Sequence, residues 1–404
     1  MDNKKRIILF SGKGGVGKTT LSLATGIKAA GRGRRVIVIS LDQAHSLRDS
    51  LDITDGELFA SEPGKPIKIS NNLFIQEIDV QTEIDRNWHR ISNYLFSLFK
   101  TTGFEDVVAE ELAVVPGMSE VIGLLYINRY YRGDEFDTII LDCPPTGESL
   151  QFIAMPDMLE WYMKKLFKLE RNIAKIARPF VKKLTDLPLP EDDYFASIKD
   201  LFYQLEGIDD ILFNPEITTA RLVTNPEKMV LQETKRAFMY FSLFNLSIDA
   251  VYVNRILDES ISDPFFKRWK EIQLLYRKQM EEFFYPVPVL DVPLLENEVL
   301  GLETLRGFSD RVYGDHESPD DVFFTKKVME ITGKRGHYTL RLFLPLIKKE
   351  DIYLYRNNQE LIIRIGSFKK HVFLPDSLKK HDVISAKKEG EYLCIGFGDN
   401  NEKV

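Results

Sequence analysis

Residues 12–19 read Gly-Lys-Gly-Gly-Val-Gly-Lys-Thr, and they directly follow the apolar run Arg-Ile-Ile-Leu-Phe at residues 6–10. The spacing G-x-x-x-x-G-K-T between a strand signal and a helix signal is typical of a phosphate-binding loop. Its glycines let backbone N–H groups close on phosphate oxygens, and a helix that begins near Lys18 presents its positive end to them. The stretch predicts that Lys18 contacts the β- and γ-phosphates and that the Thr19 hydroxyl ligates Mg²⁺.

A second lysine, Lys13, lies near the start of this loop, where a plain phosphate loop has no need of one. The stretch Lys13–Thr19 resembles the deviant loop of dimeric ATPases, in which the first lysine reaches the nucleotide of the facing subunit. The resemblance implies that ATP is the nucleotide and that the protein forms a homodimer.

Composition limits the class of protein. The chain has 404 residues, of which 44% are hydrophobic and 28% charged, as in a soluble globular protein of two or three domains. We find no membrane-spanning apolar run and no signal peptide, so we expect a cytoplasmic protein. The net charge of −7 argues against a general nucleic-acid binder. The two cysteines, Cys143 and Cys394, form no C-x-x-C pair, so we expect no zinc site.

Short apolar runs recur along the first 300 residues or so, with helical stretches such as 226–244 and 263–284 between them. Runs of this kind indicate strands buried on both faces, and their alternation with helices predicts a doubly wound, mostly parallel α/β sheet. Ligands of such sheets bind beyond the carboxyl ends of the strands. The expected strands lie at residues 35–41, 73–79, 138–142, 220–224, 250–254 and 288–292.

Two helical insertions, at about residues 88–131 and 155–213, interrupt this pattern and are rich in large apolar side chains. One interpretation is that these helices pack on the sheet and on each other. The other is a helical subdomain that presents an apolar groove to a client, because methionine side chains adapt to varied partners. The second insertion contains, for example, Met155, Met158 and Trp161.

The last part of the chain has a different period. Residues 311–334 are polar and acidic and are interpreted as a linker after an ATPase domain at 1–310. From 335 to 404 apolar residues alternate with polar ones in several short runs separated by turn signals, which predicts an all-β sandwich.

Two aspartates end predicted strands, Asp42 and Asp142. Carboxylates at strand ends beside a phosphate loop have two natural roles, to hold Mg²⁺ and to orient or deprotonate the attacking water. Gly147 follows closely enough for its backbone N–H to sense the γ-phosphate. We expect positioning and charge neutralisation by Lys13, Lys18 and Mg²⁺ to dominate catalysis.

Four motifs carry a family resemblance: the loop, Asp-Gln-Ala-His-Ser-Leu at 42–47, Asp-Cys-Pro-Pro-Thr-Gly at 142–147, and Pro-Glu at 226–227 with Glu-Thr at 233–234. Residues 5–310 resemble the family of arsenite-pump ATPases and tail-anchored-protein targeting ATPases. The β-sandwich resembles the α-crystallin-like domain that ends some members. The resemblance therefore implies an Mg²⁺-dependent ATPase.

The resemblance also implies roles for individual residues. Asp42 is the switch I residue that activates water, and Asp142 and Gly147 belong to switch II. Glu227 lies at the nucleotide, and Asn254 reads the adenine beside the segment that contains Pro293. The expected catalytic residues are Asp42, Lys13 and Lys18; the expected metal ligands are Thr19, Asp42 and Asp142; and the expected nucleotide contacts are Gly12, Lys13, Gly14, Gly15, Val16, Gly17, Lys18, Thr19, Thr20, Gly147, Glu227, Asn254 and Pro293.

One departure from the family concerns zinc. Members that target tail-anchored proteins in fungi and animals bind zinc between subunits through a C-x-x-C. Here the matching residues 263–269 read Asp-Pro-Phe-Phe-Lys-Arg-Trp, without cysteine. We therefore expect no zinc-bridged dimer, whereas a nucleotide-dependent dimer stays open.

The leading functional hypothesis is a homodimeric ATPase whose nucleotide cycle moves a helical subdomain that handles apolar clients or membrane-protein segments. A membrane-associated receptor would be a further partner, and nucleic acid is not expected. Two alternatives remain: a chaperone-like binding module in which the β-sandwich holds unfolded chains and ATP only regulates, and an arsenite- or anion-transporting ATPase subunit.

Overall fold

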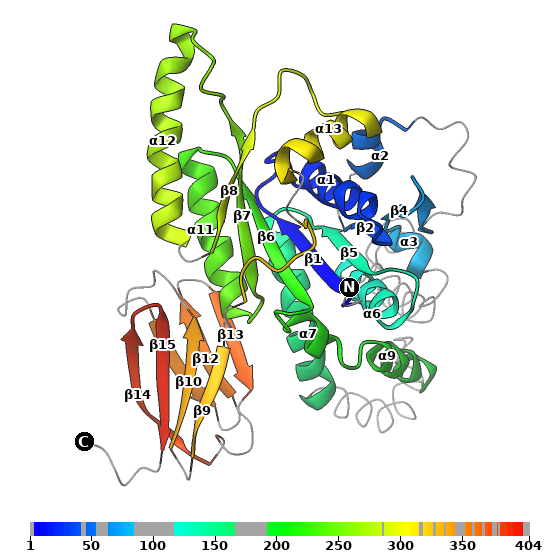
Figure 1. Cartoon of the computed structure of the whole chain (residues 1–404). Helices are drawn as coiled ribbons and strands as arrows, with labels where there is room; N and C mark the ends of the chain where they lie inside the picture. Colours follow the sequence, from blue (N-terminus) through cyan, green and yellow to red (C-terminus); the bar gives the residue numbers. More distant parts are fainter. Residues whose placement is uncertain are drawn as a thin grey trace, which may run out of the picture. The chain divides into compact units, whose positions relative to one another are not determined.

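The computed structural model divides into two compact units, which are described separately (Figure 1). The first unit comprises Met1–Ile7, Thr19–Ile211 and Val299–Asp320, and the second comprises Ile8–Lys18, Leu212–Glu298 and Asp321–Val404. The structure describes residues 4–41, 46–53, 64–84, 117–165, 192–284, 287–314, 318–325, 329–334, 337–343, 352–357, 360–365, 368–373, 378 and 380–398.

An eight-stranded sheet has the strand order β3-β4-β2-β5-β1-β6-β7-β8. β2 pairs in parallel with β4 and β5, and β7 pairs in parallel with β6 and β8, while β3 is antiparallel to β4. The strands are β1 (Arg6–Ser11), β2 (Val36–Ser40), β3 (Ile67–Lys68), β4 (Leu73–Glu77), β5 (Thr138–Asp142), β6 (Thr218–Thr224), β7 (Ile248–Ile256) and β8 (Val289–Pro293).

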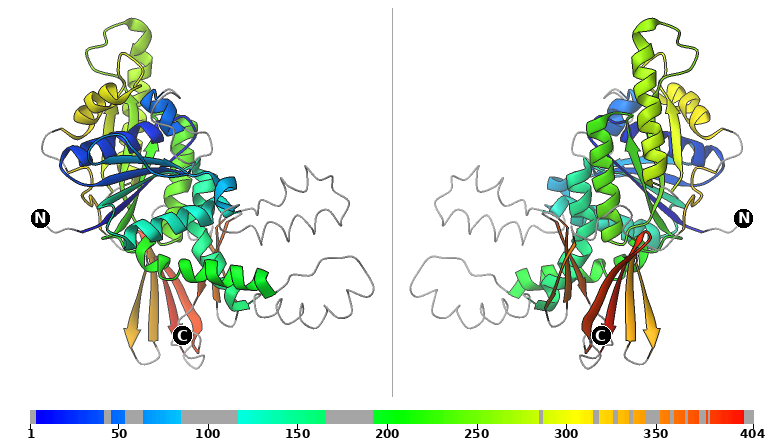
Figure 2. Two further views of the ribbon diagram at one scale, coloured as in Figure 1. Left: turned by 90° about the vertical axis from the view of Figure 1, so that its right-hand side faces the viewer. Right: turned by 90° about the vertical axis from the view of Figure 1, so that its left-hand side faces the viewer.

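Helices cover both faces of the strands in the first unit. Figure 2 shows α1 and α13 on one side of these strands and α6 and α7 on the other, and every residue of β2 and β5 is buried. Two bonds tie α1 to α13, from Thr25 to Tyr313 and from Lys28 to Asp310. The helices are α1 (Lys18–Gly31), α2 (Ser46–Leu51), α3 (Val80–Glu83), α6 (Met118–Arg132), α7 (Thr146–Lys165), α9 (Asp192–Gln204), α10 (Ile208–Leu212), which ends one residue inside the second unit, and α13 (Leu302–Tyr313).

Two long helices, α11 (Lys228–Leu243) and α12 (Pro264–Phe284), pack against β6, β7 and β8 in the second unit (Figure 2). A fully buried ion pair joins Arg221 on β6 to Asp249 on β7, with 3.2 Å between Nε and Oδ1. This pair joins two neighbouring parallel strands at positions that precede their carboxyl ends.

The C-terminal strands form two antiparallel sheets, β14-β15-β10-β9 and β11-β12-β13. Their shared core contains Leu340 and Leu342 from β10, Leu361 and Ile363 from β12, and Ile395 from β15. The strands are β9 (Met329–Lys334), β10 (His337–Phe343), β11 (Ile352–Asn357), β12 (Glu360–Ile365), β13 (Phe368–Phe373), β14 (Asp382–Glu389) and β15 (Tyr392–Gly398).

The fold class predicted from the sequence is confirmed, with a mostly parallel sheet, helices around it and a C-terminal β-sandwich. Much of the two predicted helical insertions lies outside the described residues, which show α6 in the first and α7, α9 and α10 in the second. Within the part of the chain that the structure describes, no helix combines the length and apolar character needed to cross a membrane.

Candidate functional site

The phosphate loop lies between β1 and α1, and three of its glycines have backbone angles that favour glycine. Gly12, Gly15 and Gly17 have φ angles of 156°, 76° and 99°. A Cβ atom on Gly12 would lie 2.2 Å from the carbonyl oxygen of Val223 on β6. A Cβ on Gly14 or Gly15 would meet no atom within 4 Å, so the space over the middle of the loop is open. Open space beside a glycine-rich loop at the start of a helix lets phosphate oxygens approach its backbone N–H groups.

Lysine side chains supply positive charge to this loop. Lys18, the first residue of α1, is 7% exposed, and its Nζ donates to the carbonyl oxygen of Lys13 at 3.3 Å. The bond folds the ammonium group back over the loop, where it can move onto a phosphate. Lys13 is half-buried, and Thr20 lies in the first turn of α1.

Two residues near the end of β7 hold the loop from outside. Asn254 donates its Nδ2 to the carbonyl oxygen of Val16 at 2.8 Å, and Arg255 donates its Nη2 to that of Gly15 at 3.0 Å. A Cβ on Gly17 would lie 2.3 Å from the Asn254 amide nitrogen. The close packing of Asn254 therefore also requires glycine at position 17.

In the first unit, Thr19 lies beside one of the predicted switch carboxylates. Its Oγ1 donates to Asp142 Oδ2 at 2.6 Å, and the Ser46 hydroxyl lies 3.4 Å away. Asp142 is 1% exposed and ends β5, in register with Ser40 at the end of β2. A hydroxyl and a carboxylate in contact are a donor set that suits Mg²⁺, which prefers oxygen ligands and keeps several waters. Thr19 and Asp142 would hold such an ion, directly or through water, and the ion would neutralise phosphate charge.

The predicted water-activating residue, Asp42, lies outside the described residues. The residue before it, Leu41, donates its backbone N–H to the carbonyl oxygen of Asp142 at 3.0 Å. Further along the chain, the backbone N–H and guanidinium of Arg48 in α2 both contact the buried carboxylate of Glu77. The chain on each side of Asp42 is therefore fixed to the carboxyl ends of β5 and β4.

The remaining predicted residues lie at ends of elements. Gly147 lies in the first turn of α7, and a Cβ atom added to it would meet no atom within 4 Å. Glu227 is the exposed N-cap residue of α11, and Pro293 ends β8. Between β6 and Glu227, Asn225 is 4% exposed, and among the described residues its Oδ1 has no hydrogen-bond partner.

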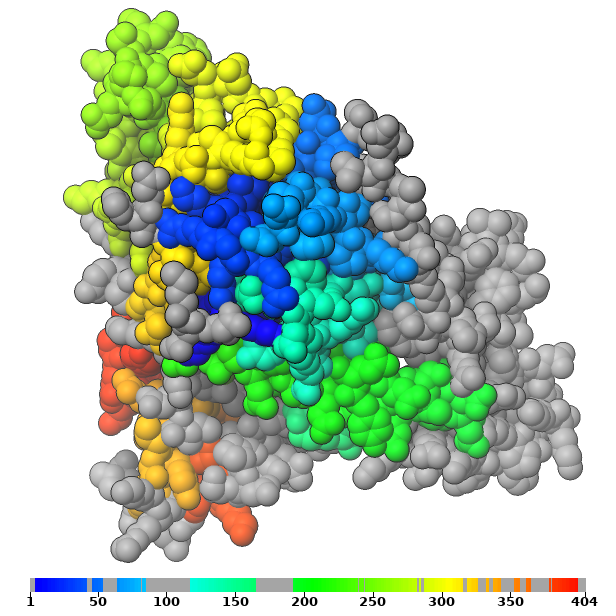
Figure 3. All heavy atoms as spheres, turned by 45° about the vertical axis from the view of Figure 1, so that its right-hand side comes forward, coloured from blue at the N-terminus to red at the C-terminus, as the bar shows by residue number. Residues whose placement is uncertain are grey.

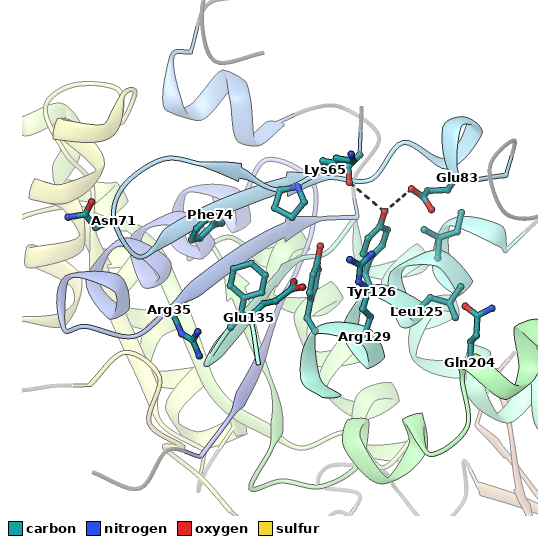
Figure 4. Close-up of a pocket in the computed structure, with 15 residues that line it drawn as sticks. Arg35, Lys65, Asn71, Phe74, Glu83, Leu125, Tyr126, Arg129, Glu135 and Gln204 are labelled. Carbon is teal, nitrogen blue, oxygen red and sulfur yellow. Dashed lines mark hydrogen bonds between the residues drawn. The ribbon is translucent and has the colours of Figure 1, made fainter. Parts of the chain in front are cut away.

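A separate cavity of about 930 Å³ lies in the first unit, lined by residues of α6 and of the β3–β4 hairpin (Figure 4). Its aromatic wall includes Phe136 edge-on to Phe74 and Tyr130, and Tyr126 donates its hydroxyl to Glu83 at 2.8 Å. Burial raises the pKa of Tyr130 to about 12. The residues that line it include none of those predicted from the motifs, so we treat the phosphate loop as the candidate site.

Comparison with known proteins identifies the family. The model of the anion-transporting ATPase family ArsA matches residues 5–314, and that of the HSP20-like domain found in ArsA matches residues 335–397. The chain belongs to the ArsA ATPase family.

Two of the relatives match nearly the whole chain. A putative arsenical pump-driving ATPase 1 from Aquifex aeolicus is 49% identical over 394 residues, which are 96% of this chain and 99% of that protein. A putative arsenical pump-driving ATPase from Chlorobaculum tepidum is 35% identical over 97% of this chain and 96% of its own length. The ATPase get3 of Schizosaccharomyces pombe is 27% identical over 77% of this chain and 92% of its own length.

As a member of the ArsA family, the chain is an ATPase that uses a nucleotide. In phosphoryl transfer the protein mainly positions groups and neutralises charge. The loop N–H groups and Lys18 suit binding of the β- and γ-phosphates.

Sequence reasoning missed Arg255 and Asn225. Arg255 follows Asn254, which the family resemblance identified. Its left-handed backbone angle and its bond to Gly15 arise only when β7 packs beside a loop 240 residues away in the sequence. Asn225 is next to the Pro-Glu motif, and a search of motif neighbours would have found it.

Proposed function

We propose that the chain is a homodimeric, Mg²⁺-dependent ATPase that acts as a switch, binding apolar clients such as membrane-protein segments in a targeting or chaperone role. ATP hydrolysis would change the position of helical segments that hold the client. The name get3, carried by one relative, and the exposed apolar side chains of α7 both support this proposal.

The observation that carries it is the course of α7. This helix begins at Thr146, four residues after Asp142, and continues without interruption to Lys165. Near its far end Met158 is 58% exposed and Trp161 is 38% exposed. A single 20-residue helix, about 30 Å long, thus runs from the predicted γ-phosphate sensor to an exposed apolar surface.

Two features suit this helix to such a role. Pro156 lies inside α7 and lacks the N–H that a regular helix would use, so it favours a bend between the two ends. Beyond it, Tyr162 and Met163 pack on the buried Phe195 of α9. Figure 3 shows α9 (green) at the surface, and Tyr203 on this helix is 55% exposed.

Client binding is tested with a labelled transmembrane-like peptide, a leucine–alanine helix of about 20 residues. The Asp42→Asn protein, in which we expect hydrolysis to fall about 10²- to 10⁴-fold while ATP still binds, should capture this peptide with ATP. Met158→Glu with Trp161→Glu should lose capture and keep ATPase activity. Met229→Glu, at a methionine 67% exposed on α11, is the matched control. Equal capture by all variants would contradict the assignment of α7.

The dimer is tested by mixing two inactive chains, Lys13→Ala and Asp42→Asn. If Lys13 acts on the facing subunit, one site of the mixed dimer keeps its own Asp42 and receives Lys13 from the other chain. We expect part of the activity to return. Absence of rescue, with mixed dimers demonstrated by two affinity tags, would mean that Lys13 acts in its own subunit or has no catalytic role.

The names of the relatives from Aquifex aeolicus and Chlorobaculum tepidum favour a second candidate, an arsenical pump-driving ATPase. Trivalent arsenic prefers several thiolates, whereas this chain has Cys143 and Cys394, both buried. Stimulation of ATP hydrolysis by arsenite would support this candidate. An unchanged rate, with peptide capture intact, would support the client-binding proposal.

A further inference from the structure

The last residues of β7 depart from regular strand geometry. The pairing between β7 and β8 shifts register between Val253 and Ile256, which marks a bulge at Asn254 and Arg255. Arg255 has a φ angle of 61°, a left-handed conformation that few residues other than glycine and asparagine adopt. Strain of this kind persists only where surrounding contacts hold it, and it is concentrated at functional sites.

The bulge aims two successive side chains at the same target. In a regular strand neighbouring side chains point to opposite faces, whereas a bulge redirects one of them. Here Asn254 bonds to the carbonyl oxygen of Val16 and Arg255 to that of Gly15. The backbone N–H of Arg255 donates to Asn254 Oδ1 at 2.8 Å, which fixes the orientation of the amide.

A glutamine from α12 holds the bulge in place. Gln273 Oε1 accepts a hydrogen bond from the backbone N–H of Leu257 at 3.1 Å, and its Nε2 donates to the carbonyl oxygen of Arg255 at 3.0 Å. The side chain thus satisfies the backbone C=O of Arg255, in the bulge, and the backbone N–H that follows Ile256, the residue at which pairing with β8 resumes. The contacts connect Gln273, the bulge and the phosphate loop within one compact unit.

The peptide planes explain what this connection does. In a planar trans peptide the C=O of one residue and the N–H of the next point in opposite directions. Holding the carbonyl oxygens of Gly15 and Val16 on the outside of the loop therefore turns the N–H groups of Val16 and Gly17 to the other side. Those N–H groups are the donors that a phosphate loop offers to its nucleotide.

We propose that Arg255 and Gln273 are positioning residues for ATP hydrolysis. Gln273 fixes the bulge, the bulge aims Arg255 at the loop, and the guanidinium bond to Gly15 keeps the loop N–H groups oriented for phosphate. Neither side chain is required to touch the reacting atoms.

The first test uses Arg255→Gly. Glycine adopts the left-handed angle without strain, so the variant should melt at the wild-type temperature or slightly above it while losing the bond to Gly15. We expect its affinity for a fluorescent ATP analogue to fall about tenfold or more. Arg255→Lys, which keeps the charge, should recover part of the affinity. A merely structural role would lower the melting temperature and the affinity together.

The second test uses α12. Gln273→Leu should weaken ATP-analogue binding and raise the KM for ATP, whereas Arg268→Ala, an exposed site on the same helix, should change neither. Should Gln273→Leu fold poorly, Gln273→Glu keeps an acceptor for Leu257 and replaces the donor to the Arg255 carbonyl oxygen with a charged acceptor, so it should also weaken binding of the ATP analogue.

The double variant Arg255→Gly with Gln273→Leu should bind the ATP analogue as tightly as the single variant with the lower affinity. The two losses should not add, because both residues act on the loop through the same bond from Arg255 to Gly15. Wild-type affinity in Arg255→Gly, or fully additive losses in the double variant, would overturn the proposal.

Discussion

At Gly12 the position of one backbone atom decides which residue the loop accepts. The Val223 carbonyl oxygen lies 2.2 Å from the position of a Cβ, and backbone cannot move aside cheaply. Gly12→Ala should therefore destabilise the second unit by about 1–3 kcal/mol, the usual cost of overpacking, and weaken nucleotide binding.

Gly14→Ala is the matched control for this prediction, because a Cβ there meets no protein atom within 4 Å. Its melting temperature without nucleotide should equal that of the wild type. The prediction is wrong if Gly12→Ala and Gly14→Ala have the same melting temperature in the absence of nucleotide.

At the scale of elements, a fully buried ion pair between Arg221 and Asp249 connects strands β6 and β7. Removing one partner of a buried pair leaves an uncompensated charge and costs about 3–5 kcal/mol. We therefore expect Asp249→Asn to be strongly destabilising in denaturant unfolding, and Arg221→Met added to it to recover part of the loss.

The control for the buried pair is the ion pair between Lys28 and Asp310, at 2.7 Å with an aspartate 67% exposed. Asp310→Asn should cost no more than about 1 kcal/mol. Equal losses in Asp249→Asn and Asp310→Asn would argue against a special role for the buried pair.

The amino ends of β2 and β5 are joined by Asp137, whose carboxylate accepts from the backbone N–H of Arg35 at 2.9 Å. Partial burial acts to raise the pKa of Asp137, but hydrogen bonds from Arg35 and the charges of Arg35 and Arg34 outweigh it, so the pKa lies below its ordinary value. A carboxyl group whose pKa is lower in the folded state stabilises the fold above its unfolded pKa near 4, and this contribution is lost as the pH falls through the folded pKa.

We accordingly expect the stability difference between wild type and Asp137→Asn to be constant from about pH 7 to pH 5 and to shrink below about pH 4. Denaturant midpoints of both proteins across this range measure it. A difference that grows as the pH falls would have the wrong sign for this linkage.

At the scale of the whole molecule, the segment after α13 is packed in its described part, residues 318–325. In the first unit the carbonyl oxygen of Asp320 accepts a hydrogen bond from the Arg6 guanidinium. The Asp320 carboxylate forms an ion pair with Arg34, with 3.0 Å between Oδ2 and Nε. In the second unit Arg221 donates to the carbonyl oxygen of Asp321 at 2.9 Å, and its guanidinium lies over the ring of Phe323. β9 then pairs with β10 of the β-sandwich.

These contacts determine where the chain can be divided. We propose that a chain ending at Thr325 folds and hydrolyses ATP at close to the wild-type rate, because it keeps the packed segment and omits β9. A chain ending at Gly314 should melt lower, by about 5 °C or more. Loss of ATPase activity in the longer fragment would mean that the β-sandwich is needed by the ATPase domain.

The sequence alone determined those strands and loops whose pattern is contained within a few consecutive residues. The loop spacing, the β-branched strand at 138–142 and the period-two runs of β10, β12 and β15 each encode burial or backbone geometry within a few residues, so the fold class, the family and the position of the loop were predictable. Thr19 and Asp142 were both expected as metal ligands, because ligands of parallel sheets bind beyond the carboxyl ends of the strands, and the structure has their side chains in contact.

Only the tertiary structure decided which distant segments support the loop. Gly15 lies 240 residues from Arg255, and Gln273 lies on the helix that follows β7, 18 residues after Arg255. No period or motif links the three residues. Likewise, the polar, acidic composition that predicted a linker at 311–334 gave no sign that Asp320 and Asp321 would accept hydrogen bonds from arginines 314 and 100 residues away. The physical reason is that a sequence pattern reports whether a segment is buried or turned, while hydrogen-bond partners depend on where the packed segments meet.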